Sequence, residues 1–494
     1  MFCSGADSSE GLVNEEASKR MMSGRLTEQE AAQRIRQFEQ ENELFRIKVD
    51  GVSAWRLLRF WVSMQLIIRP EGEKAASDGK KRLLRGLREM PRYFFPKRAR
   101  FLMDTSSSMR IEKESALYKD VFFDDLVLSL SDCFKLERVN SEVFHVFNKQ
   151  ALVKSDLTAT PLELLTGFLN RITLRRPEIE TIARQLSEPI QHDLGLALTA
   201  AQISRELHYF YWGRRVYRRL LKKIRPQAVL ISNTNEFAML AAARDLDIRS
   251  FEMQHGIFSR NHPDALPVEA KPYKETLLVP DKVLLFGDYW RKELAANGFY
   301  DDELLPVGSV RMDKYRRLRA VRRAADGPTQ VVFTTQGLVV SEVAAYLRDF
   351  MILVEKASMD LELTIKLHPV YDPSPEPYRQ VFGEDKRIHI VLGTEMPSTF
   401  TLLSQADMHV SIASACHYDA LGLGVPTVVA ALSGYTVVEN LIESGHAPAV
   451  RTPRELVGLL MDIKRYAVPS AVQELYFKSG ALENIRHAVM QEEK

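Results

Sequence analysis

Two histidines follow apolar, strand-like runs of the sequence. His255 ends the run Ile248–Met253 and precedes Gly256, and His368 ends the run Leu361–Leu367 and precedes Pro369. An imidazole with a pKa near ~6.5 exchanges a proton close to neutral pH, and open α/β sheets place their sites at the carboxyl ends of strands. We expect Gly256 to let the backbone turn sharply and leave His255 accessible as a general base. The alternative for both histidines is a structural role, packed or bonded at the strand end.

Two small, polar turns have the composition of phosphate sites. Ser411–Ser414 precede a helix-like segment, with Ser414 as the natural N-cap, and free N–H groups at a helix start favour a phosphate. Thr335, Gln336 and Gly337 follow another strand-like run, and a turn this small lets backbone N–H groups approach a phosphate or base. Simple capping is the alternative. The turn is not a G-x-G-x-x-G, so no dinucleotide cofactor is expected.

The elements that would position these residues alternate between strands and helices, which predicts mostly parallel, doubly wound sheets. The expected strands, in chain order, are 99–103, 121–130, 144–147, 228–232, 248–253, 282–286, 304–307, 330–334, 361–367, 388–392, 408–412 and 426–430.

Five parts are expected along the 494 residues, a length that favours two or three domains. They are a disordered N-terminus at 1–27, a helical extension with a basic segment at 28–98, a first Rossmann-like domain at 99–325, a second one at 326–450, and C-terminal helices at 451–494. The predicted fold class is therefore α/β, with two tandem Rossmann-like domains facing a cleft and helices at both ends.

Composition is that of a soluble globular protein, with 45% hydrophobic and 27% charged residues. The 67 basic and 65 acidic residues nearly balance, so no nucleic-acid partner is expected. Three widely spaced cysteines fit a reducing compartment. No run approaches the ~20 apolar residues of a membrane span, and the first residues do not resemble a signal peptide. We expect a cytoplasmic protein.

Two segments mix basic residues with apolar or aromatic ones: Lys80–Arg100 and Arg214–Arg225. Such a mixture on a helix suits an anionic membrane surface, which would place the protein at the inner face of the cytoplasmic membrane. The alternative is a solvated face and an interdomain linker.

An apparent metal motif is discounted. Asp245-Leu246-Asp247 has the D-x-D spelling of metal-dependent glycosyltransferases, but it lies between a helix and a strand, at the edge opposite the expected site. We expect no catalytic metal, and the charge of a phosphate at the site would be met by a helix dipole, hydroxyls and histidine.

Five motifs follow one another along the chain: Gln254-His255-Gly256, Gly287-Asp288-Tyr289-Trp290, Gly308–Asp313, Lys366–Pro369, and Ser411–Ala420 followed by Gly424-Val425-Pro426. This ordered set resembles the GT-B-type transferases of bacterial surface polymers, which include capsular-polysaccharide glycosyltransferases and CDP-glycerol glycerophosphotransferases. Together the motifs cover about residues 226–430.

The resemblance implies roles for particular residues. His255 would activate the acceptor hydroxyl, with Gln254, Gly256 and Arg311 on the acceptor side. His368 would contact the donor diphosphate, and the other donor residues would be Thr335, Gln336, Gly337, Lys366, Ser411, Ser414 and Asp419. Asp419 stands where the family has a ribose-binding Glu, and its side chain is one methylene shorter.

The resemblance also implies the activity: a glycosyltransferase, without metal or cofactor, that moves a sugar from a nucleotide-activated donor to a saccharide or lipid-linked acceptor of a surface polysaccharide. Transfer of a polyol phosphate from a CDP-activated donor is the alternative within transferases. A nucleotide-sugar 2-epimerase is the alternative of another class, although it needs several carboxylates, and few are seen at the expected edge of the first domain. A binding or assembly protein that has lost turnover is the third class.

Overall fold

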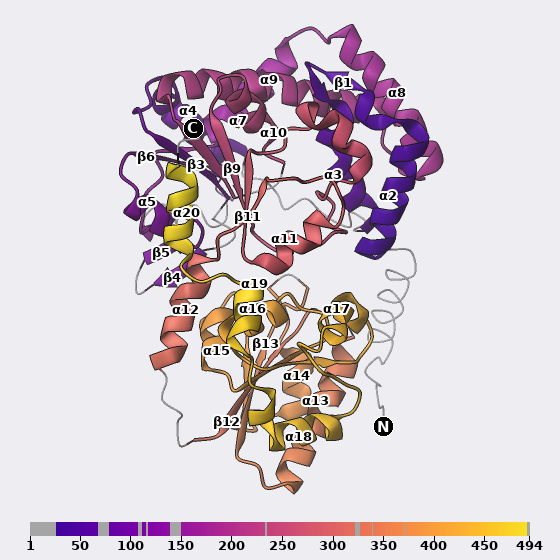
Figure 1. Cartoon of the computed structure of the whole chain (residues 1–494), viewed down its shortest axis with the longest axis vertical. Helices are drawn as coiled ribbons and strands as arrows, with labels where there is room; N and C mark the ends of the chain where they lie inside the picture. Colours follow the sequence, from indigo (N-terminus) through magenta and orange to yellow (C-terminus); the bar gives the residue numbers. More distant parts are fainter. Residues whose placement is uncertain are drawn as a thin grey trace, which may run out of the picture. The chain divides into compact units, whose positions relative to one another are not determined.

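The computed structural model describes residues 26–67, 79–106, 111–114, 117–138, 150–232, 235–321, 327–337, 339–369 and 371–491. By its internal contacts the chain divides into two compact units (Figure 1). The first unit comprises 1–110, 130–283 and 293–304, and the second comprises 111–129, 284–292 and 305–494. The second unit thus begins before the expected boundary at residue 326, because α12 (Val310–Val321) packs against α15 (Thr399–Gln405) and α16 (Cys416–Leu423).

A seven-stranded sheet runs in the order β11-β10-β9-β8-β3-β6-β7. Its strands are β3 (Phe101–Thr105), β6 (Cys133–Glu137), β7 (Leu157–Thr158), β8 (Ala228–Ile231), β9 (Arg249–Met253), β10 (Lys282–Leu285) and β11 (Leu304–Pro306). The five strands from β9 to β7 pair in parallel. From β3 the next strands in the sequence are added on one side of the sheet, and from β8 they are added on the other. The strand order therefore reverses between the neighbours β3 and β8.

Helices of the first unit share one apolar core with this sheet. They are α7 (Thr160–Ile172), α8 (Pro177–Asp193), α9 (Ala200–Ile224) and α10 (Phe237–Arg244), preceded by α2 (Glu28–Asn42), α3 (Ala54–Ile67) and α4 (Gly79–Phe94). Thr27 and Glu30 form the predicted capping box of α2. The N-terminal extension is built into the first unit, since Ile35, Phe38 and Trp55 are buried in that core.

The second unit has a six-stranded, wholly parallel sheet in the order β14-β13-β12-β15-β16-β17. Its strands are β12 (Thr329–Thr334), β13 (Leu361–Lys366), β14 (Ile388–Val391), β15 (Met408–Ser411), β16 (Thr427–Ala430) and β17 (Ala449–Val450). Helices α13 (Val340–Lys356), α14 (Glu376–Phe382), α17 (Glu439–Glu443) and α18 (Pro453–Met461) accompany it. Here the order reverses between β12 and β15. The two sheets confirm the predicted fold class of two tandem Rossmann-like α/β domains.

One strand expectation was wrong. Residues 121–130 were expected to be a strand, but they contain α5 (Asp124–Ser129). The Asp120 carboxylate accepts hydrogen bonds from the N–H groups of Phe122 and Phe123 and turns the chain into the helix. The strand beside β3 is instead β6, whose buried charges Lys135 and Glu137 pair at 3.4 Å and hide its apolar pattern. The expected strand at 144–147 and most of the expected disordered N-terminus lie outside the described residues.

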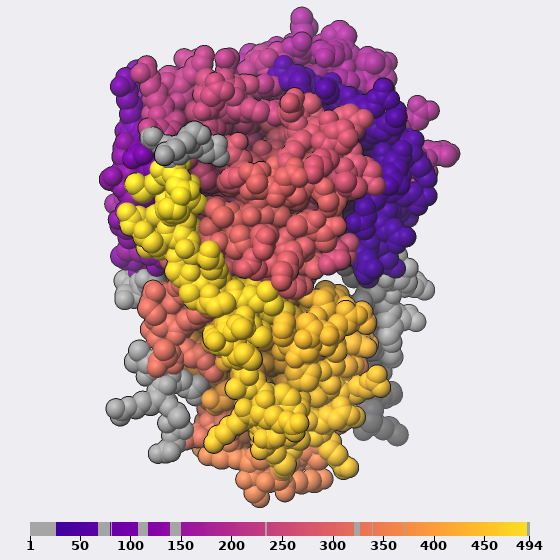
Figure 2. All heavy atoms as spheres, viewed as in Figure 1, coloured from indigo at the N-terminus to yellow at the C-terminus, as the bar shows by residue number. Residues whose placement is uncertain are grey.

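Two of the recognised motifs, Gly287–Trp290 and Gly308–Asp313, contact the C-terminal segment. Gly287 and Gly308 lie against the backbone of Leu475 and Lys478, so closely that an added Cβ would be 2.4 Å and 2.1 Å from their carbonyl oxygens. The indole of Trp290 donates to the Tyr476 carbonyl at 3.0 Å. These contacts seat α19 (Ser470–Tyr476) and α20 (Ala481–Met490), the latter being the yellow surface helix of Figure 2. The C-terminus is helical, as predicted, and is part of the second unit.

Short elements complete the described chain. β1 (Lys48–Val49) pairs with β2 (Val52–Ser53), and β4 (Ile111–Glu114) pairs with β5 (Leu117–Asp120), both antiparallel. α11 (Asp288–Ala295) follows β10. The 3-10 turns are η1 (Leu44–Arg46), η3 (Val268–Thr276), η4 (Tyr435–Val438) and η5 (Ile463–Tyr466). None of the described helices is long and apolar enough to span a bilayer.

Candidate functional site

The candidate site of the second unit lies where its strand order reverses, between the carboxyl ends of β12 and β15. Ligands of doubly wound sheets bind at such a point. The Gln336 side chain donates from Nε2 to the carbonyl of Ala413 at 2.8 Å, which ties the turn after β12 to the turn after β15. Ser411 Oγ, fully buried, donates to the Thr334 carbonyl at 2.6 Å. The structure thus brings the two predicted phosphate turns together, and Ser411 holds the strands rather than facing a ligand.

The turn after β13 joins the same edge. The N–H of His368 donates to Thr335 Oγ1 at 3.2 Å. Gly337 has a φ of +68°, and a Cβ there would lie 1.8 Å from the Tyr371 carbonyl oxygen. Because both the positive φ and the close approach exclude a side chain, Gly337 is required by the backbone. Three of the predicted donor segments therefore form one continuous edge.

The protonation state of His368 follows from its contacts. Its Nδ1 accepts a hydrogen bond from the Tyr371 N–H at 3.0 Å, and its ring stacks on the Tyr371 ring with 4.6 Å between centroids. Burial lowers the pKa of His368. A neutral ring with an accepting Nδ1 carries its proton on Nε2, so His368 is a hydrogen-bond donor without a charge.

Lys366 has a structural role that the sequence did not show. Its ammonium, at the end of β13, donates to the carbonyls of Leu392 at 2.7 Å, Glu395 at 2.7 Å and Pro397 at 3.1 Å. Since an ammonium has three protons, these bonds use all of them. Burial lowers the pKa of Lys366. In this geometry Lys366 fixes the segment between β14 and α15 and has no donor left for a phosphate.

The start of α16 differs by one residue from the expected cap. Ala415 is the N-cap, and Ser414 Oγ accepts the N–H of Cys416 at 3.2 Å from the position before it. Ser414 is buried, so its hydroxyl serves the helix start. The backbone N–H groups at this N-terminus remain the feature of the turn suited to a phosphate.

Asp419 of α16 lies within electrostatic range of Arg311 of α12. Burial raises the pKa of Asp419 to about 6, and the nearby Arg311 charge opposes that rise. The Arg311 guanidinium also lies over the Phe400 ring, 3.8 Å from its centroid. Arg311 was expected with Gln254 and Gly256 on the acceptor side. The structure places it on α12, which belongs to the second unit, whereas Gln254 and Gly256 belong to the first.

In the first unit, His255 follows β9 and is partly exposed. Its ring meets the Phe258 ring edge-on, with 5.4 Å between centroids. Gln254 is fully buried and donates from Nε2 to the carbonyl of Gly256 at 2.8 Å, closing the turn. Gly256 has an ordinary φ, and a Cβ there would meet nothing within 4 Å. The turn therefore does not depend on glycine, contrary to the sequence-based expectation.

The first unit also holds a buried charged cluster that the sequence reading missed. It occupies the reversal point of the first sheet, at the carboxyl ends of β3 and β8. The Arg138 guanidinium lies between the carboxylates of Asp104 and Glu236, donates to Glu236, and donates to the Tyr217 hydroxyl at 2.5 Å. Burial raises the pKa of Asp104. A strand end such as Phe-Leu-Met-Asp-Thr was the available signal, since polar residues there lie at the site edge.

Glu252 extends the carboxylates of this edge. It lies on β9, three residues before His255, and burial raises its pKa to about 8, aided by the nearby Asp264 charge. Asp264 is itself held by the Arg56 guanidinium at 2.6 Å, from α3. The loop after β9 is therefore anchored by the N-terminal extension. Carboxylates are abundant at this edge, and the expectation of few was wrong.

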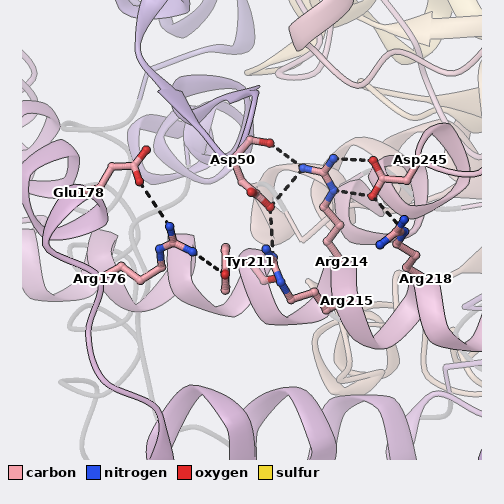
Figure 3. Close-up of polar contacts among 8 residues, drawn as sticks. All are labelled: Asp50, Arg176, Glu178, Tyr211, Arg214, Arg215, Arg218 and Asp245. Atoms are coloured by element: carbon pink, nitrogen blue, oxygen red, sulfur yellow. Dashed lines mark hydrogen bonds and ion pairs between the residues drawn. The ribbon is translucent and has the colours of Figure 1, made fainter.

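The D-x-D candidate lies at the opposite edge, as expected. Asp245 accepts two hydrogen bonds from the Arg214 guanidinium, and Arg218 lies 3.9 Å away (Figure 3). Arg214 and Arg215 also contact Asp50 (Figure 3). Asp245 thus serves an ion-pair network on α9. Within the described ranges, no group of three or more His, Cys, Asp or Glu side chains has the arrangement of a metal site.

Comparison with known proteins finds solved structures only. No family model matches the chain, and no curated protein matches its sequence. The chain is similar to the UDP-GlcNAc 2-epimerase of Neisseria meningitidis bound to UDP-GlcNAc (13% identity, 79% of this chain and 99% of that one, TM-score 0.46). It is also similar to MurG of Acinetobacter baumannii (13%, 80% and 100%, 0.44). A third similar structure is a glycosyltransferase of Rickettsia africae (9%, 81% and 100%, 0.45).

Proposed function

We propose that this protein is a glycosyltransferase that uses a nucleotide-activated sugar and acts on a saccharide or lipid-linked acceptor. The observation that carries the proposal is the joined edge of the second unit. There, a helix N-terminus, the Gly337 turn and a neutral His368 with its proton on Nε2 offer N–H donors. Donors without a full charge are suited to a diphosphate that gains charge as it leaves.

The nucleotide is assigned to this edge. Arg311 and Asp419 lie on the two helices next to it, and Asp419 is the counterpart of the ribose-binding Glu in the resemblance. A carboxylate whose pKa is raised to about 6 is largely ionised at neutral pH and can accept hydrogen bonds from two ribose hydroxyls. Lys366 and Ser411 hold the backbone around this edge through their hydrogen bonds to main-chain carbonyls.

The acceptor is assigned to the first unit, with His255 as the base. His255 would take the proton of the acceptor hydroxyl as its oxygen forms a bond to the anomeric carbon of the sugar. The bond from that carbon to the diphosphate oxygen breaks at the same time, and the nucleoside diphosphate leaves with the electron pair. The proton remains on the imidazole until it is released to solvent.

Donor binding is tested first with the second unit's residues. In the intact chain, His368→Ala should weaken binding of a nucleoside diphosphate by about tenfold, the effect of one lost hydrogen bond to a charged group. Calorimetric titration with UDP, CDP, GDP and ADP gives the affinity. His389→Ala, on the exposed end strand β14, is the matched control and should bind normally. Equal affinity in both variants would remove His368 from the donor site.

Turnover is then tested with nucleotide sugars, CDP-glycerol and lipid-linked saccharides, with release of the free nucleotide as the readout. His255→Ala should lower kcat by about a hundredfold or more and leave donor affinity unchanged, while His192→Ala, an exposed control, should be fully active. Activity should survive chelation by EDTA. Release of CMP from CDP-glycerol would select polyol-phosphate transfer. No consumption of any donor would favour an assembly protein.

A nucleotide-sugar 2-epimerase is the second candidate, favoured by Asp104 and Glu236 at the reversal point of the first sheet and by Glu252 on the adjacent strand β9. An epimerase must remove and return a proton on carbon, which requires acid and base groups near the sugar. The epimerase and the transferase differ in whether they require an acceptor. An epimerase converts the nucleotide sugar alone, with exchange of a carbon-bound proton for deuterium, and a transferase releases nucleotide only when an acceptor is present.

A further inference from the structure

Helix α4 packs on the first unit by one side only. Gly86 approaches Leu164 of α7, and the buried Tyr93 donates its hydroxyl proton to the Val216 carbonyl of α9 at 3.1 Å. Glu89 is also buried, and its carboxylate accepts hydrogen bonds from the N–H and the hydroxyl of Thr158. These residues recur every three or four positions, so they define the inward side of the helix.

The opposite side of α4 is apolar and exposed. Leu84, Leu87 and Phe95 are 68%, 55% and 85% exposed, and Leu83 beside them is 48% exposed. The first three recur along one stripe of the helix, together with the exposed Pro91. A helix that only bordered water would carry polar residues along this stripe.

Cations flank the exposed stripe without acidic residues. Lys80, Arg88 and Arg92 are exposed, and within the described part of the chain none of them has an ion-pair partner. The only acidic residue in the sequence from 79 to 100 is Glu89, which faces inward. The outer side of α4 is therefore both apolar and purely basic.

The end of α9 adds further cations beside the end of α4. Lys223 donates to the Phe94 carbonyl, and its ammonium lies 5.7 Å from the centre of the Phe95 ring. Arg219 lies over the Phe94 ring at 5.3 Å. The two basic segments recognised in the sequence thus meet. The first half of the second segment does not take part, because Arg214 and Arg215 are bound to Asp50 and Asp245 (Figure 3).

We propose that this surface, the α4 face, docks the protein onto an anionic lipid bilayer. The face is defined by Lys80, Leu83, Leu84, Leu87, Arg88, Arg92 and Phe95 with the end of α9. The leucines and Phe95 enter the boundary between head groups and acyl chains, and the cations contact lipid phosphates. Nucleic acid is the other common polyanion, but its phosphate backbone offers no apolar region in which a stripe of exposed leucines could be buried. The proposal does not depend on the proposed function.

Vesicle binding by the full-length protein tests the proposal. The protein should sediment with vesicles that contain about one-third phosphatidylglycerol and much less with pure phosphatidylcholine, and salt should weaken the binding. Leu84→Glu with Leu87→Glu should reduce binding by at least about tenfold. Ile352→Glu, at an exposed apolar position of α13, is the matched control and should bind as the wild type does.

The charged component has its own control. Arg88→Glu with Arg92→Glu should abolish the preference for anionic vesicles, and Arg454→Glu on α18, also exposed, should not. Leu87→Trp keeps an apolar residue, and its fluorescence should shift to the blue on anionic vesicles. Binding that survives the leucine double variant, or no blue shift at position 87, would overturn the proposal. So would equal retention of the wild type and that variant on a short DNA duplex with no binding to vesicles.

Discussion

Two glycines beside candidate site residues differ in what their backbone requires. Gly337→Ala should destabilise the protein by about 2 kcal/mol or more, because it adds a left-handed penalty to a clash with the Tyr371 carbonyl. Gly256→Ala should change stability by less than about 0.5 kcal/mol, since its φ is ordinary and its surroundings are open. Denaturant unfolding of the two variants measures the difference. Equal destabilisation would contradict the geometry of one turn.

A pH dependence is expected from Glu252. Burial raises its pKa from 4.5 to about 8, so the folded protein binds this proton more tightly than the unfolded chain does. The free energy of unfolding should therefore fall as pH rises from about 4.5 to 8, by up to about 1.4 kcal/mol per pH unit. Glu252→Gln, which imitates the protonated form, should flatten this slope. An unchanged slope in the variant would assign the effect to other groups.

At the scale of elements, Arg316 of α12 joins two segments that are distant in sequence. Its guanidinium donates to the carbonyls of Gly422 at 2.7 Å, Gln473 at 2.9 Å and Phe477 at 2.8 Å. Arg316→Ala would leave these carbonyls without a partner and should cost about 3 kcal/mol of stability. Arg317→Ala, its exposed neighbour on the same helix, should cost less than about 0.5 kcal/mol. The thermal unfolding midpoints of the pair decide whether Arg316 holds the segments together.

The sequence predicted elements best where hydrophobic pattern and turn residues agreed. Ten of the expected strands fall on or beside observed ones, and the Rossmann-like class followed from their alternation. The sequence-based prediction missed strand β6. Lys135 and Glu137 form a buried ion pair there, but in the sequence they look like surface residues. A pattern method weighs each residue alone, and a buried pair is visible only in three dimensions.

The same limit applies to the candidate site. His368 and the turns after β12 and β15 could be placed from strand ends alone, and they do lie at one edge. The partners of polar side chains could not be foreseen: Lys366 binds three carbonyls, and the Arg311 guanidinium lies over the Phe400 ring. Spacing gives the position of a residue on an element, and only packing determines which group it meets.

At the scale of the whole molecule, the last helices complete the second unit. A chain ending at Pro469 lacks α19 and α20 and should fail to yield a stable, soluble protein, because the surfaces around Trp290 and Arg316 lose their cover. A chain ending at Gln491 keeps both helices and is the control. Expression followed by size-exclusion chromatography distinguishes them. A well-folded product from the shorter chain would show that these helices are dispensable.

The docking of the C-terminal segment also sets an order of events during synthesis. Trp290 meets its Tyr476 partner 186 residues later, and Asp313 accepts the N–H of Ala481, which lies 168 residues after it. A ribosome adding about 5–20 residues per second needs roughly ten seconds or more for that distance. Tyr418 can pack on Trp290 earlier, but the Tyr476 carbonyl that accepts the indole proton is made only at the end of this interval. We therefore expect the contacts between α11 and α19 to form last among those of this aromatic cluster.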